Sequence, residues 1–431
     1  MASEQPIIIG FGPAGMFAAL ELIELGHRPL IFERGKNIEE RSADIKMFVQ
    51  ERKLDPESNI QFGEGGAGSY SDGKLFSRTN NSLVANKVLE TFVRFGAPDD
   101  ITHKSKPHLG TDILCEIVKN IRKYILSRGG EINFSSKMTG LIVHNSRAKG
   151  VVINSVNEYL SSKIFLAIGH SARDTFEMLH KENILIEQKP ISVGVRIEHP
   201  AEVINTIRQS KEAATYSLSY KDKEADRGVY TFCMCPGGEI VNASSEKGHL
   251  VLNGMSYSKR DSKFSNAAII VTCKTGDYGS DHPLAGIYYQ KGIEQKAFVA
   301  GGAMWKAPAQ NLEDFLSGKI SETLLENSFR MGAKPAQLSG LFPGFVTEHL
   351  KRAFLFWKKE YPLFVSDRAI LLGAETRAVC PVSFPRNDRC ESANVSGLFP
   401  IGEGSGHAGG ITSSAIDAIK AVRAMHDRKN Q

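Results

Sequence analysis

The pattern of apolar and polar positions is clearest in the first 33 residues. A short apolar run at residues 6–10 is typical of a buried parallel strand, and a glycine-containing turn at residues 11–15 precedes a helix predicted over residues 16–25. Gly26 follows that helix and would end it as a left-handed cap residue. A second apolar run over residues 28–33 ends in an acid, so the segment predicts a β-α-β unit.

Helical and strand patterns continue along the chain. The apolar spacing predicts further helices at residues 38–51, 81–95, 111–127, 287–300, 347–359 and 411–426. Short strands are expected between residues 131 and 156 and over residues 163–169. A period of two, typical of an antiparallel sheet, marks residues 229–243, 250–257 and 267–274.

This change of pattern, from about Pro190, indicates a second domain. From Leu398 the pattern returns to strand, glycine turn and helix, so we expect the last segment to fold back onto the first domain. The predicted fold class is α/β, with a discontinuous Rossmann-like domain and an inserted α+β domain built on an antiparallel sheet. The predicted boundaries are 1–190 and 371–431 for the two parts of the first domain, and 191–370 for the inserted domain.

Composition narrows the classes of function. Of 431 residues, 41% are hydrophobic and 23% charged, an ordinary balance for a globular protein. The formal charge of +5 is spread along the chain, which disfavours nucleic acid as a partner. No apolar run reaches the roughly 18 to 20 residues of a transmembrane helix. The N-terminus lacks a basic region before its apolar stretch, and there are six cysteines, so we expect a cytoplasmic protein with reduced thiols and no metal site.

The first turn matches a dinucleotide fingerprint. Gly10, Gly12 and Gly15 would provide a tight turn, room for a pyrophosphate and close packing of helix on strand. Pro13 and Ala14 open the helix, whose N-terminus favours an anion. Glu33 ends the second strand, where an acid accepts ribose hydroxyls and repels a 2′-phosphate. Together these features predict an adenine-dinucleotide site.

FAD and NAD both satisfy that fingerprint, so the choice depends on the rest of the chain. A flavin stays bound and is held along its whole length. The C-terminal stretch at residues 400–412 is typical of a second clamp, formed by Gly402, Glu403, Gly409, Gly410 and Ile411. The N-terminus of a helix that begins at Ile411 would stabilise negative charge on a reduced flavin ring. The predicted cofactor is therefore FAD.

Several longer motifs point to a known family. They lie at residues 10–15, 62–75, 231–238 with 253–257, 402–411, 106–112 and 373–377. With these motifs the chain resembles the NAD(FAD)-utilising dehydrogenases, a family of FAD-dependent oxidoreductases. The resemblance covers nearly the whole chain. It implies a flavoprotein with one Rossmann domain, whose FAD-binding part is discontinuous and carries an inserted substrate domain.

The resemblance also implies that the glycine-rich loop at residues 63–74 approaches the flavin. From this loop we expect FAD to contact Gly65, Gly66, Gly68, Ser69 and Lys74. The predicted cofactor site further includes Arg34, Met138 and Gly169. Lys74 and Arg78 would either neutralise the diphosphate or be solvated surface charges.

Three residues are candidates for the chemistry. His407 and His108 are candidate proton donors or acceptors, because imidazole titrates near neutral pH. For each histidine the alternative is a hydrogen bond to the loop backbone. Arg377 would either bind a substrate carboxylate with two hydrogen bonds or pair with Glu375.

The thiols Cys233 and Cys235 are separated by one residue and do not form a CxxC motif. On a regular strand both sulfurs would point to one face, but a disulfide across one residue is strained. Packing as two small apolar residues is the favoured interpretation, and a disulfide or flavin-linked role is the alternative.

No second β-α-β unit with its own GxGxxG fingerprint, which a resident NADPH domain would need, is evident, so NAD(P)H would dock transiently or the substrate itself would reduce the flavin. The predicted function is an FAD-dependent oxidoreductase that transfers a hydride between flavin N5 and a small organic substrate in a pocket between the domains. A flavin-dependent oxidase or monooxygenase that uses oxygen is one alternative. A non-catalytic flavin-binding redox sensor is the alternative of another class.

Overall fold

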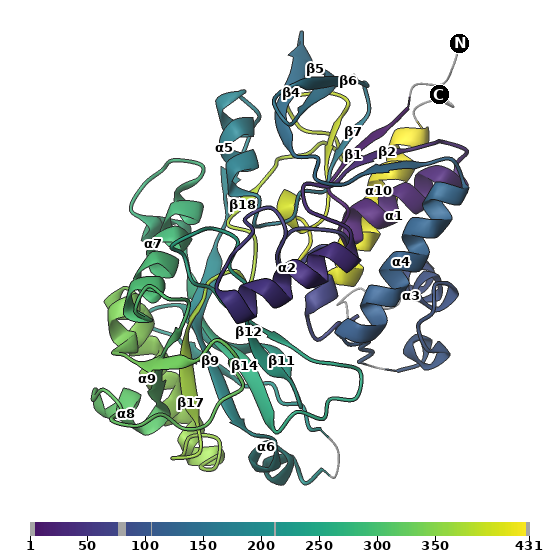
Figure 1. Ribbon diagram of the computed structural model, residues 1–431. Helices are drawn as coiled ribbons and strands as arrows, with labels where there is room; N and C mark the ends of the chain where they lie inside the picture. The colour runs from purple at the N-terminus through teal and green to yellow at the C-terminus, as the bar shows by residue number, and fades with distance from the viewer. Residues whose placement is uncertain (1–4, 76–82, 105, 211–212, 428–431) are drawn as a thin grey trace.

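The protein is described by a computed structural model that covers residues 5–75, 83–104, 106–210 and 213–427 (Figure 1). A parallel sheet and a larger, mainly antiparallel sheet organise the chain. This arrangement confirms the predicted mixed α/β fold class. None of the helices in the described ranges is long and apolar enough to cross a membrane.

The parallel sheet has the strand order β19-β7-β1-β2-β3. Its strands are β1 (Ile7–Ile9), β2 (Leu30–Phe32), β3 (Glu131–Asn133), β7 (Ile164–Leu166) and β19 (Leu398–Pro400). Each strand is only three residues long, and β1, β2, β7 and β19 are buried throughout, as expected for strands covered on both faces. Because β19 comes from the C-terminal segment and pairs with β7, the two ends of the chain meet in this sheet.

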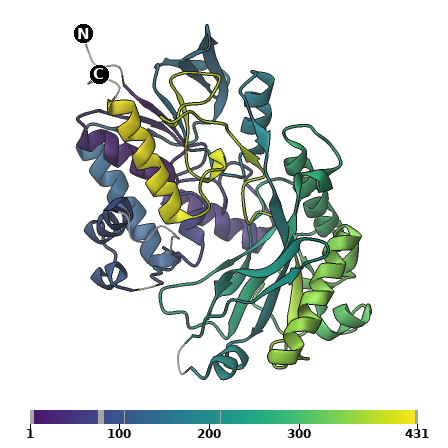
Figure 2. The ribbon, with the colours of Figure 1, turned by 180° about the vertical axis from the view of Figure 1, so that it is seen from behind.

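Helices from both ends of the chain pack beside this sheet. They are α1 (Pro13–Glu24), α2 (Ile38–Glu51), α3 (Leu83–Arg94), α4 (Thr111–Ser127) and α10 (Ile411–Asp427). Figures 1 and 2 show α1 and α10 lying side by side, and the two helices are in direct contact. Their small and apolar residues share one core with the buried face of α4.

The larger sheet has the strand order β10-β11-β14-β9-β17-β15-β16. Its strands are β9 (Ile191–Pro200), β10 (Ser219–Asp222), β11 (Arg227–Cys235), β14 (Phe264–Cys273), β15 (Ala307–Asn311), β16 (Ala333–Pro335) and β17 (Ile370–Glu375). All pairs are antiparallel except β15 with β16. One side of the sheet is covered by α7 (Ala285–Ala300), α8 (Leu312–Ser317) and α9 (Gly344–Glu360) (Figure 1).

Smaller elements complete the fold. The strands are β4 (Met138–His144), β5 (Arg147–Ile153), β6 (Asn157–Leu160), β8 (Glu187–Gln188), β12 (Glu239–Asn242), β13 (Leu252–Met255) and β18 (Val382–Ser383). The helices are α5 (Arg173–Lys181) and α6 (Ala201–Arg208). The three-stranded sheet β4-β5-β6 lies beside the parallel sheet. The strands expected between residues 131 and 156 are β3 of the parallel sheet and β4 and β5 of this smaller sheet.

The helices predicted from apolar spacing all appear, with ends shifted by a few residues. The predicted start of α3 lies outside the described residues, and its described part begins at Leu83. The sequence patterns did not identify β9 and β17, because strands buried on both faces carry no alternation. The domain boundaries stay predictions. Strand β17 spans the predicted boundary at 370/371, and it pairs with β9 and β15 of the larger sheet.

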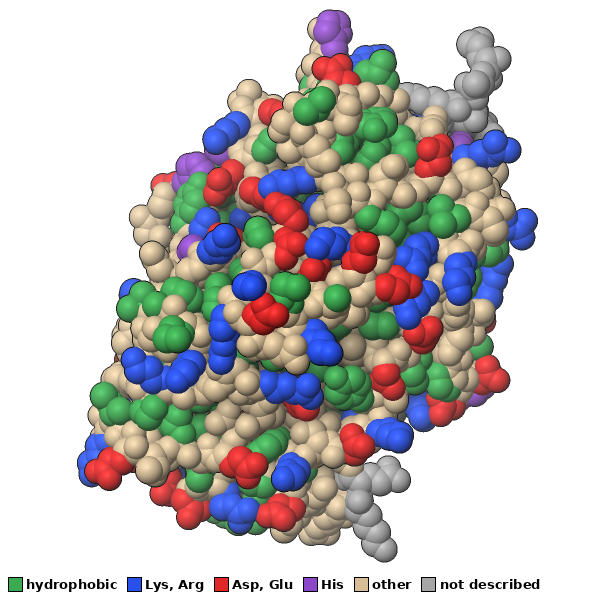
Figure 3. All heavy atoms as spheres, in the orientation of Figure 1, with side chains coloured by type: hydrophobic (Ala, Val, Ile, Leu, Met, Phe, Trp, Pro, Cys, Tyr) green, Lys and Arg blue, Asp and Glu red, His purple; other side chains and the backbone are tan. Residues whose placement is uncertain are grey.

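Basic and acidic side chains are interspersed on the face of the molecule shown in Figure 3. On that face they form no continuous basic area. This distribution agrees with the even spread of charge along the chain.

Candidate functional site

A cavity of about 370 Å³ lies where the two sheets meet, beyond the ends of β1, β2 and β7. Its wall has two parts of different character. The first part consists mainly of glycine turns and small residues from the parallel-sheet region. The second part comes from the larger sheet and its neighbours, and contributes Phe232, Cys233, Asn253, Glu375, Arg377 and Ala378.

The first turn of the chain forms one side of this cavity, and its glycines serve different purposes. Gly10 has φ +98°, and a Cβ there would lie 2.3 Å from the Ala167 carbonyl oxygen. A Cβ on Gly15 would lie 2.0 Å from the Gly10 carbonyl oxygen. Gly15 does not line the cavity, and its role is the close packing of helix on strand. Gly12 lines the cavity together with Pro13 and Ala14.

Glu33 lies at the end of β2 and joins two glycine turns. One carboxylate oxygen accepts a hydrogen bond from the Phe11 N–H at 2.7 Å. The other accepts from the N–H groups of Gly35 at 2.9 Å and Gly63 at 3.0 Å. A carboxylate offers about four lone-pair positions, so capacity remains for one further donor from the cavity. Its predicted contact with a ribose stays a prediction.

The glycine-rich loop is held from behind by a buried arginine that the sequence did not reveal. Arg41 on α2 donates hydrogen bonds to three backbone carbonyl groups of this loop and to two that precede it, at distances from 2.6 to 3.3 Å. The loop therefore presents Gly66, Gly68 and Lys74 to the cavity. Gly65 and Ser69 do not line the cavity. They pack against one another inside the loop, since a Cβ on Gly65 would lie 2.0 Å from the Ser69 hydroxyl oxygen.

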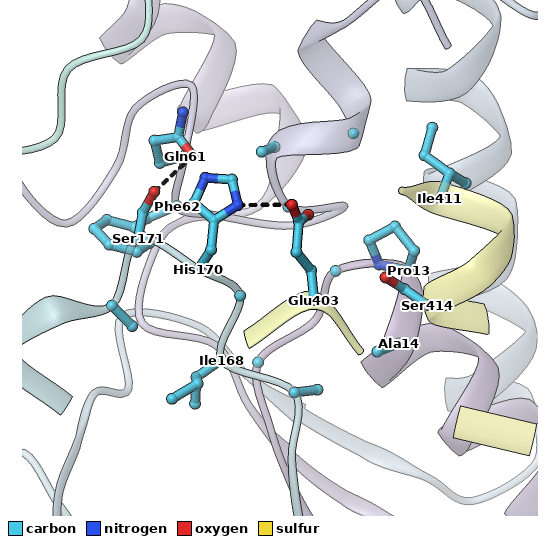
Figure 4. Close-up of a pocket in the computed structure, with 18 of the residues that line it drawn as sticks. Pro13, Ala14, Gln61, Phe62, Ile168, His170, Ser171, Glu403, Ile411 and Ser414 are labelled. Carbon is cyan, nitrogen blue, oxygen red and sulfur yellow. Dashed lines mark hydrogen bonds and ion pairs between the residues drawn. The ribbon is translucent and has the colours of Figure 1, made fainter. Parts of the chain in front are cut away.

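The C-terminal turn closes the cavity from the other side. Glu403 reaches toward His170, with 3.0 Å between the carboxylate and Nδ1 (Figure 4). Figure 4 also shows Ile411 at the start of α10 opposite Pro13 at the start of α1. Gly409 and Gly410 line the cavity, whereas Gly402 lies behind it and donates its N–H to Asp417 at 2.8 Å.

The space beside two glycines of this wall indicates whether a long ligand fits against it. A Cβ on Gly409 would meet nothing within 4 Å, and a Cβ on Gly12 would have its nearest neighbour at 3.5 Å. Gly12 has φ −83°, which any residue can adopt, so neither crowding nor backbone conformation explains its identity. Both positions border the cavity. The bare backbone therefore fits a ligand that lies against it, as a dinucleotide diphosphate would.

The remaining predicted cofactor residues are spread along the same wall. Arg34, Met138 and Gly169 all line the cavity. Arg34 is fixed by paired hydrogen bonds to Asp174 at 2.9 Å and by Glu57 at 2.7 Å. These positions extend the site from Glu33 toward β4, which is the end expected for the adenosine half.

The predicted catalytic histidines lie away from the cavity wall. The Nε2 atom of His407 is 2.9 Å from the Phe384 carbonyl oxygen, and the side chain does not line the cavity. His108 lies beside Lys74, and burial together with Arg260 lowers its pKa. The catalytic roles of both residues stay predictions.

Arg377 does line the cavity, but its partner differs from the expected one. It forms two hydrogen bonds to Glu294, at 3.0 and 2.8 Å, and donates to the hydroxyls of Ser171 and Ser245. The alternative pairing with Glu375 is wrong, because Glu375 pairs with Arg196 at 3.2 Å.

Glu294 is shared by two guanidinium groups. Burial would raise its pKa, but Arg173 and Arg377 together hold it well below its usual range. This charge cluster fixes the wall beside the larger sheet, where α5, α7 and the residues after β17 meet. Because Glu294 and Arg377 are separated by 83 positions in the sequence, no local pattern indicated their contact.

A second charge cluster surrounds Lys74, which was predicted as either a diphosphate contact or a solvated charge. Its ammonium lies 3.0 Å from Asp72 and donates to the Met234 carbonyl. Asp72 also accepts from Ser256 at 2.5 Å and from Arg260 at 2.7 Å. Burial would raise the pKa of Asp72, but Lys74 and Arg260 lower it. Lys74 thus faces the larger sheet, and Arg78 lies outside the described residues.

Comparisons with known proteins agree with this arrangement. Residues 190–378 match a family model described as "FAD-dependent protein, C-terminal domain-like". An uncharacterized protein of Clostridium beijerinckii is 43% identical over 427 residues, which covers 97% of this chain and 80% of that protein.

Solved structures are similar only at a distance. The crystal structure of CtdE in complex with FAD is 14% identical, covers 98% of this chain and 84% of that chain, and has a TM-score of 0.36. The glycerol-3-phosphate dehydrogenase of Bacillus halodurans complexed with FAD is 11% identical, covers 100% of this chain and 65% of that chain, and has a TM-score of 0.41. The assignment rests on the family match and on the Clostridium relative. The chain belongs to this family of FAD-dependent proteins, and it is an FAD-dependent oxidoreductase whose cofactor is FAD.

Proposed function

We propose that the protein transfers a hydride between FAD and a small organic substrate, with NAD(P)H as a transient donor of electrons. FAD supplies the ring that gives or accepts the hydride. The main support for this proposal is that the residues lining the cavity differ between its two ends. Glycine turns and small side chains predominate at one end, although Glu33, Arg34 and Glu403 also line it, whereas Lys74, Cys233 and Glu375 lie at the end next to the larger sheet. The titratable groups of this second end would serve the substrate.

The first end is suited to hold the cofactor. The turn from Gly10 to Pro13 would hold the diphosphate at the N-terminus of α1. The open position on Glu33 would accept a ribose hydroxyl. The N-terminus of α10 would lie beside the ring and favour negative charge there.

Glu375 is the group that we propose to exchange a proton with the substrate. Its carboxyl is buried at the cavity wall, and burial raises its pKa to about 7, although Arg196 opposes this shift. A group with a pKa near the working pH is effective as a general acid or base. Asn253 lines the cavity beside it and hydrogen-bonds Arg196 at 3.3 Å, which holds the pair in place.

The proposal is tested by reduction of the bound flavin without oxygen. NADH, NADPH and a panel of small alcohols, amines and hydroxy acids are added to the FAD-loaded protein, and flavin absorbance is followed. We expect at least one donor to bleach the flavin within the time of a turnover. Rapid recovery in air would favour the oxidase or monooxygenase alternative. Failure of every donor would contradict the proposal and favour the redox sensor.

A pair of variants tests the role of Glu375. We expect Glu375→Gln to slow flavin reduction by about a hundredfold and to remove the pH dependence near neutrality, with FAD affinity unchanged. Glu198→Gln is the matched control, because burial also raises the pKa of Glu198 to about 7 but its side chain does not line the cavity. Equal pH profiles for both variants would contradict the assignment.

We also propose that the protein works in the cytoplasm. The six cysteines support this location, because all are free thiols, as is usual in a reducing compartment. Fractionation of cells that express the untagged protein, followed by immunoblotting, tests it. Recovery outside the cytoplasmic fraction would contradict the proposal.

A further inference from the structure

The thiols of Cys233 and Cys235 lie at an irregularity of strand β11. Phe232 pairs with Ala268 of β14, but Cys235 pairs with Asn266, so β11 contains one extra residue. Cys233 has φ +44°, a left-handed conformation that is uncommon for a residue other than glycine. Such β-bulges re-aim side chains and are frequent next to active sites. The bulge turns Cys233 toward the cavity, which it lines.

Cys235 lies directly behind Cys233. Its thiol is buried and donates a hydrogen bond to the Cys233 carbonyl oxygen at 3.3 Å. Gly254 on β13 makes room for this arrangement, since a Cβ there would lie 2.7 Å from the Cys235 sulfur. The pair therefore presents one thiol to the cavity and keeps a second thiol in contact with it.

Two cationic side chains are fixed beside the pair by the backbone of the bulge. The Cys233 carbonyl accepts a hydrogen bond from Arg196 at 2.7 Å, and the Met234 carbonyl accepts one from Lys74. The bulge thus anchors one ammonium and one guanidinium group next to the sulfurs.

The electrostatic surroundings favour a thiolate at Cys233. The neighbouring Cys235 thiol lowers the pKa of Cys233, and Lys74 and Arg196 lower it further. Burial and the Asp72 carboxylate act in the opposite direction, and the Glu375 carboxyl also faces Cys233. The same surroundings raise the pKa of Cys235. By contrast, burial raises the pKa of Cys115 to about 11 and that of Cys380 to about 12. A thiolate beside a protonated partner thiol is the usual arrangement of a reactive pair.

We propose that Cys233 and Cys235 are a redox-active dithiol of the FAD cavity, which exchanges electrons with the flavin and with a small-molecule disulfide. This inference rests on the proposed function and adds a class of substrate to that function, small-molecule disulfides. A disulfide across one residue is strained, and strained disulfides are the easily reduced and catalytic ones. The left-handed residue and the bulge turn the Cys233 side chain away from the direction that it would have on a regular strand.

Both half-reactions balance. When the external disulfide is reduced, the Cys233 thiolate attacks one of its sulfurs, and the first small thiol leaves as a thiolate that takes a proton from solvent. Cys235 gives its proton to the second leaving sulfur and attacks the Cys233 sulfur, so that the second small thiol leaves and the protein disulfide remains. To close the cycle, the protein disulfide takes up two electrons and one proton, and its S–S bond breaks to restore the Cys233 thiolate and the Cys235 thiol; bound FAD in its reduced form would supply the two electrons. The net reaction converts one disulfide into two thiols and reoxidises the flavin.

Mass spectrometry tests the disulfide independently of activity. Trypsin releases residues 228–247 as one peptide, in which Cys233 and Cys235 are the two cysteines. After the FAD-loaded protein is oxidised with diamide and unreacted thiols are blocked, we expect this peptide to be lighter by two hydrogen masses than the fully reduced form. Dithiothreitol should restore the reduced mass. A peptide that carries two blocked thiols after oxidation would overturn the proposal.

An anaerobic titration with dithionite then counts electrons. The oxidised wild-type protein should take up two electrons for the flavin and two more for the disulfide. The variants Cys233→Ser and Cys235→Ala should take up only those of the flavin, and Cys115→Ser, as matched control, should behave like the wild type. If wild-type protein takes up only the flavin electrons, the dithiol is overturned. Absence of flavin absorbance would instead indicate failure of cofactor binding, while the peptide mass still reports on the thiols.

Alkylation by iodoacetamide tests the positioning role of Lys74. We expect Cys233 to react with a midpoint pH below that of an ordinary thiol, near 8.5. Lys74→Met should raise this midpoint by about one pH unit, because a neighbouring cation is lost, and Lys74→Arg should restore it. An unchanged midpoint in Lys74→Met would contradict the electrostatic role of Lys74, and a midpoint at or above 8.5 in the wild type would contradict the thiolate.

Discussion

The two sides of the cavity are built in different ways. On the side of the parallel sheet, the wall is bare backbone at Gly12, Gly66 and Gly409, and Glu33 lines the cavity beside it. On the side of the larger sheet, charged side chains such as Arg377 and Glu375 form the wall and are held in ion pairs. A backbone wall suits the diphosphate and sugars that every dinucleotide shares. A wall of side chains can differ between enzymes, and it determines which substrate reacts.

Among substitutions on the side of the backbone wall, we expect the largest effect at Gly15, which packs helix α1 on the strand behind that wall. A Cβ there would lie 2.0 Å from the Gly10 carbonyl oxygen, which is backbone and cannot turn aside. We expect Gly15→Ala to abolish FAD binding and to lower the melting temperature of the apoprotein. Flavin fluorescence during dialysis and thermal unfolding measure the two effects. Normal FAD content in this variant would contradict the packing argument.

On the side of the side-chain wall, we expect the largest effect from a substitution of Glu294, which holds the lining residue Arg377. Its removal leaves Arg173 and Arg377 buried without their anion, so Glu294→Gln should reduce the free energy of unfolding by about 3 to 5 kcal/mol. Urea unfolding measures this change. The matched control is Glu313→Gln on the exposed face of α8, where we expect a change within about 0.5 kcal/mol. Equal effects of the two substitutions would show that the buried cluster does not stabilise the junction.

The free energy of unfolding should depend on pH through Glu375, which belongs to the side-chain wall. Burial raises its folded-state pKa to about 7, whereas an unfolded glutamate has a pKa of about 4.3. Between these values the folded chain holds a proton that the unfolded chain releases, so this group makes the unfolding free energy fall as pH rises. From about pH 5 to about pH 8, wild-type stability should fall by on the order of 1 to 3 kcal/mol more than that of Glu375→Gln. Urea unfolding at both pH values checks this, and parallel curves would contradict it.

The smallest expected effect comes from Gly12, where the protein leaves room for a side chain. Gly12→Ala should keep the stability of the apoprotein and weaken FAD binding by about tenfold, or about 1.4 kcal/mol. The reason is that its nearest neighbour would be 3.5 Å from the new Cβ, while the cavity side is reserved for the ligand. Calorimetric titration with FAD, alongside thermal unfolding, separates the two quantities. A loss of stability without a loss of affinity would refute this interpretation.

The backbone wall was predictable from sequence because its residues are contiguous. Gly10 to Gly15 and Gly409 to Ile411 each lie at the junction of a strand or turn with a helix, and local patterns report such junctions. The side-chain wall was not predictable, since Arg196, Cys233 and Glu375 come from three strands and meet only through the pairing of the sheet.

Two other residues of the site, one behind the wall and one in it, were also missed. Arg41 binds backbone carbonyls of the glycine-rich loop, and no side-chain pattern encodes such partners. His170 follows Gly169 and could have been found as the polar residue at the end of a predicted strand. The histidines that were chosen, His108 and His407, were selected by motif, but neither side chain lines the cavity.

A crystal structure of the protein with bound FAD tests the central claim most directly, that one cavity with two different walls holds the cofactor along its length. The adenosine is expected beside Glu33 and Met138, the diphosphate at the turn from Gly10 to Pro13, and the flavin ring between Ile411 and the larger sheet, facing Cys233 and Glu375. A flavin ring at the Glu33 end, or FAD bound outside this cavity, would contradict the account.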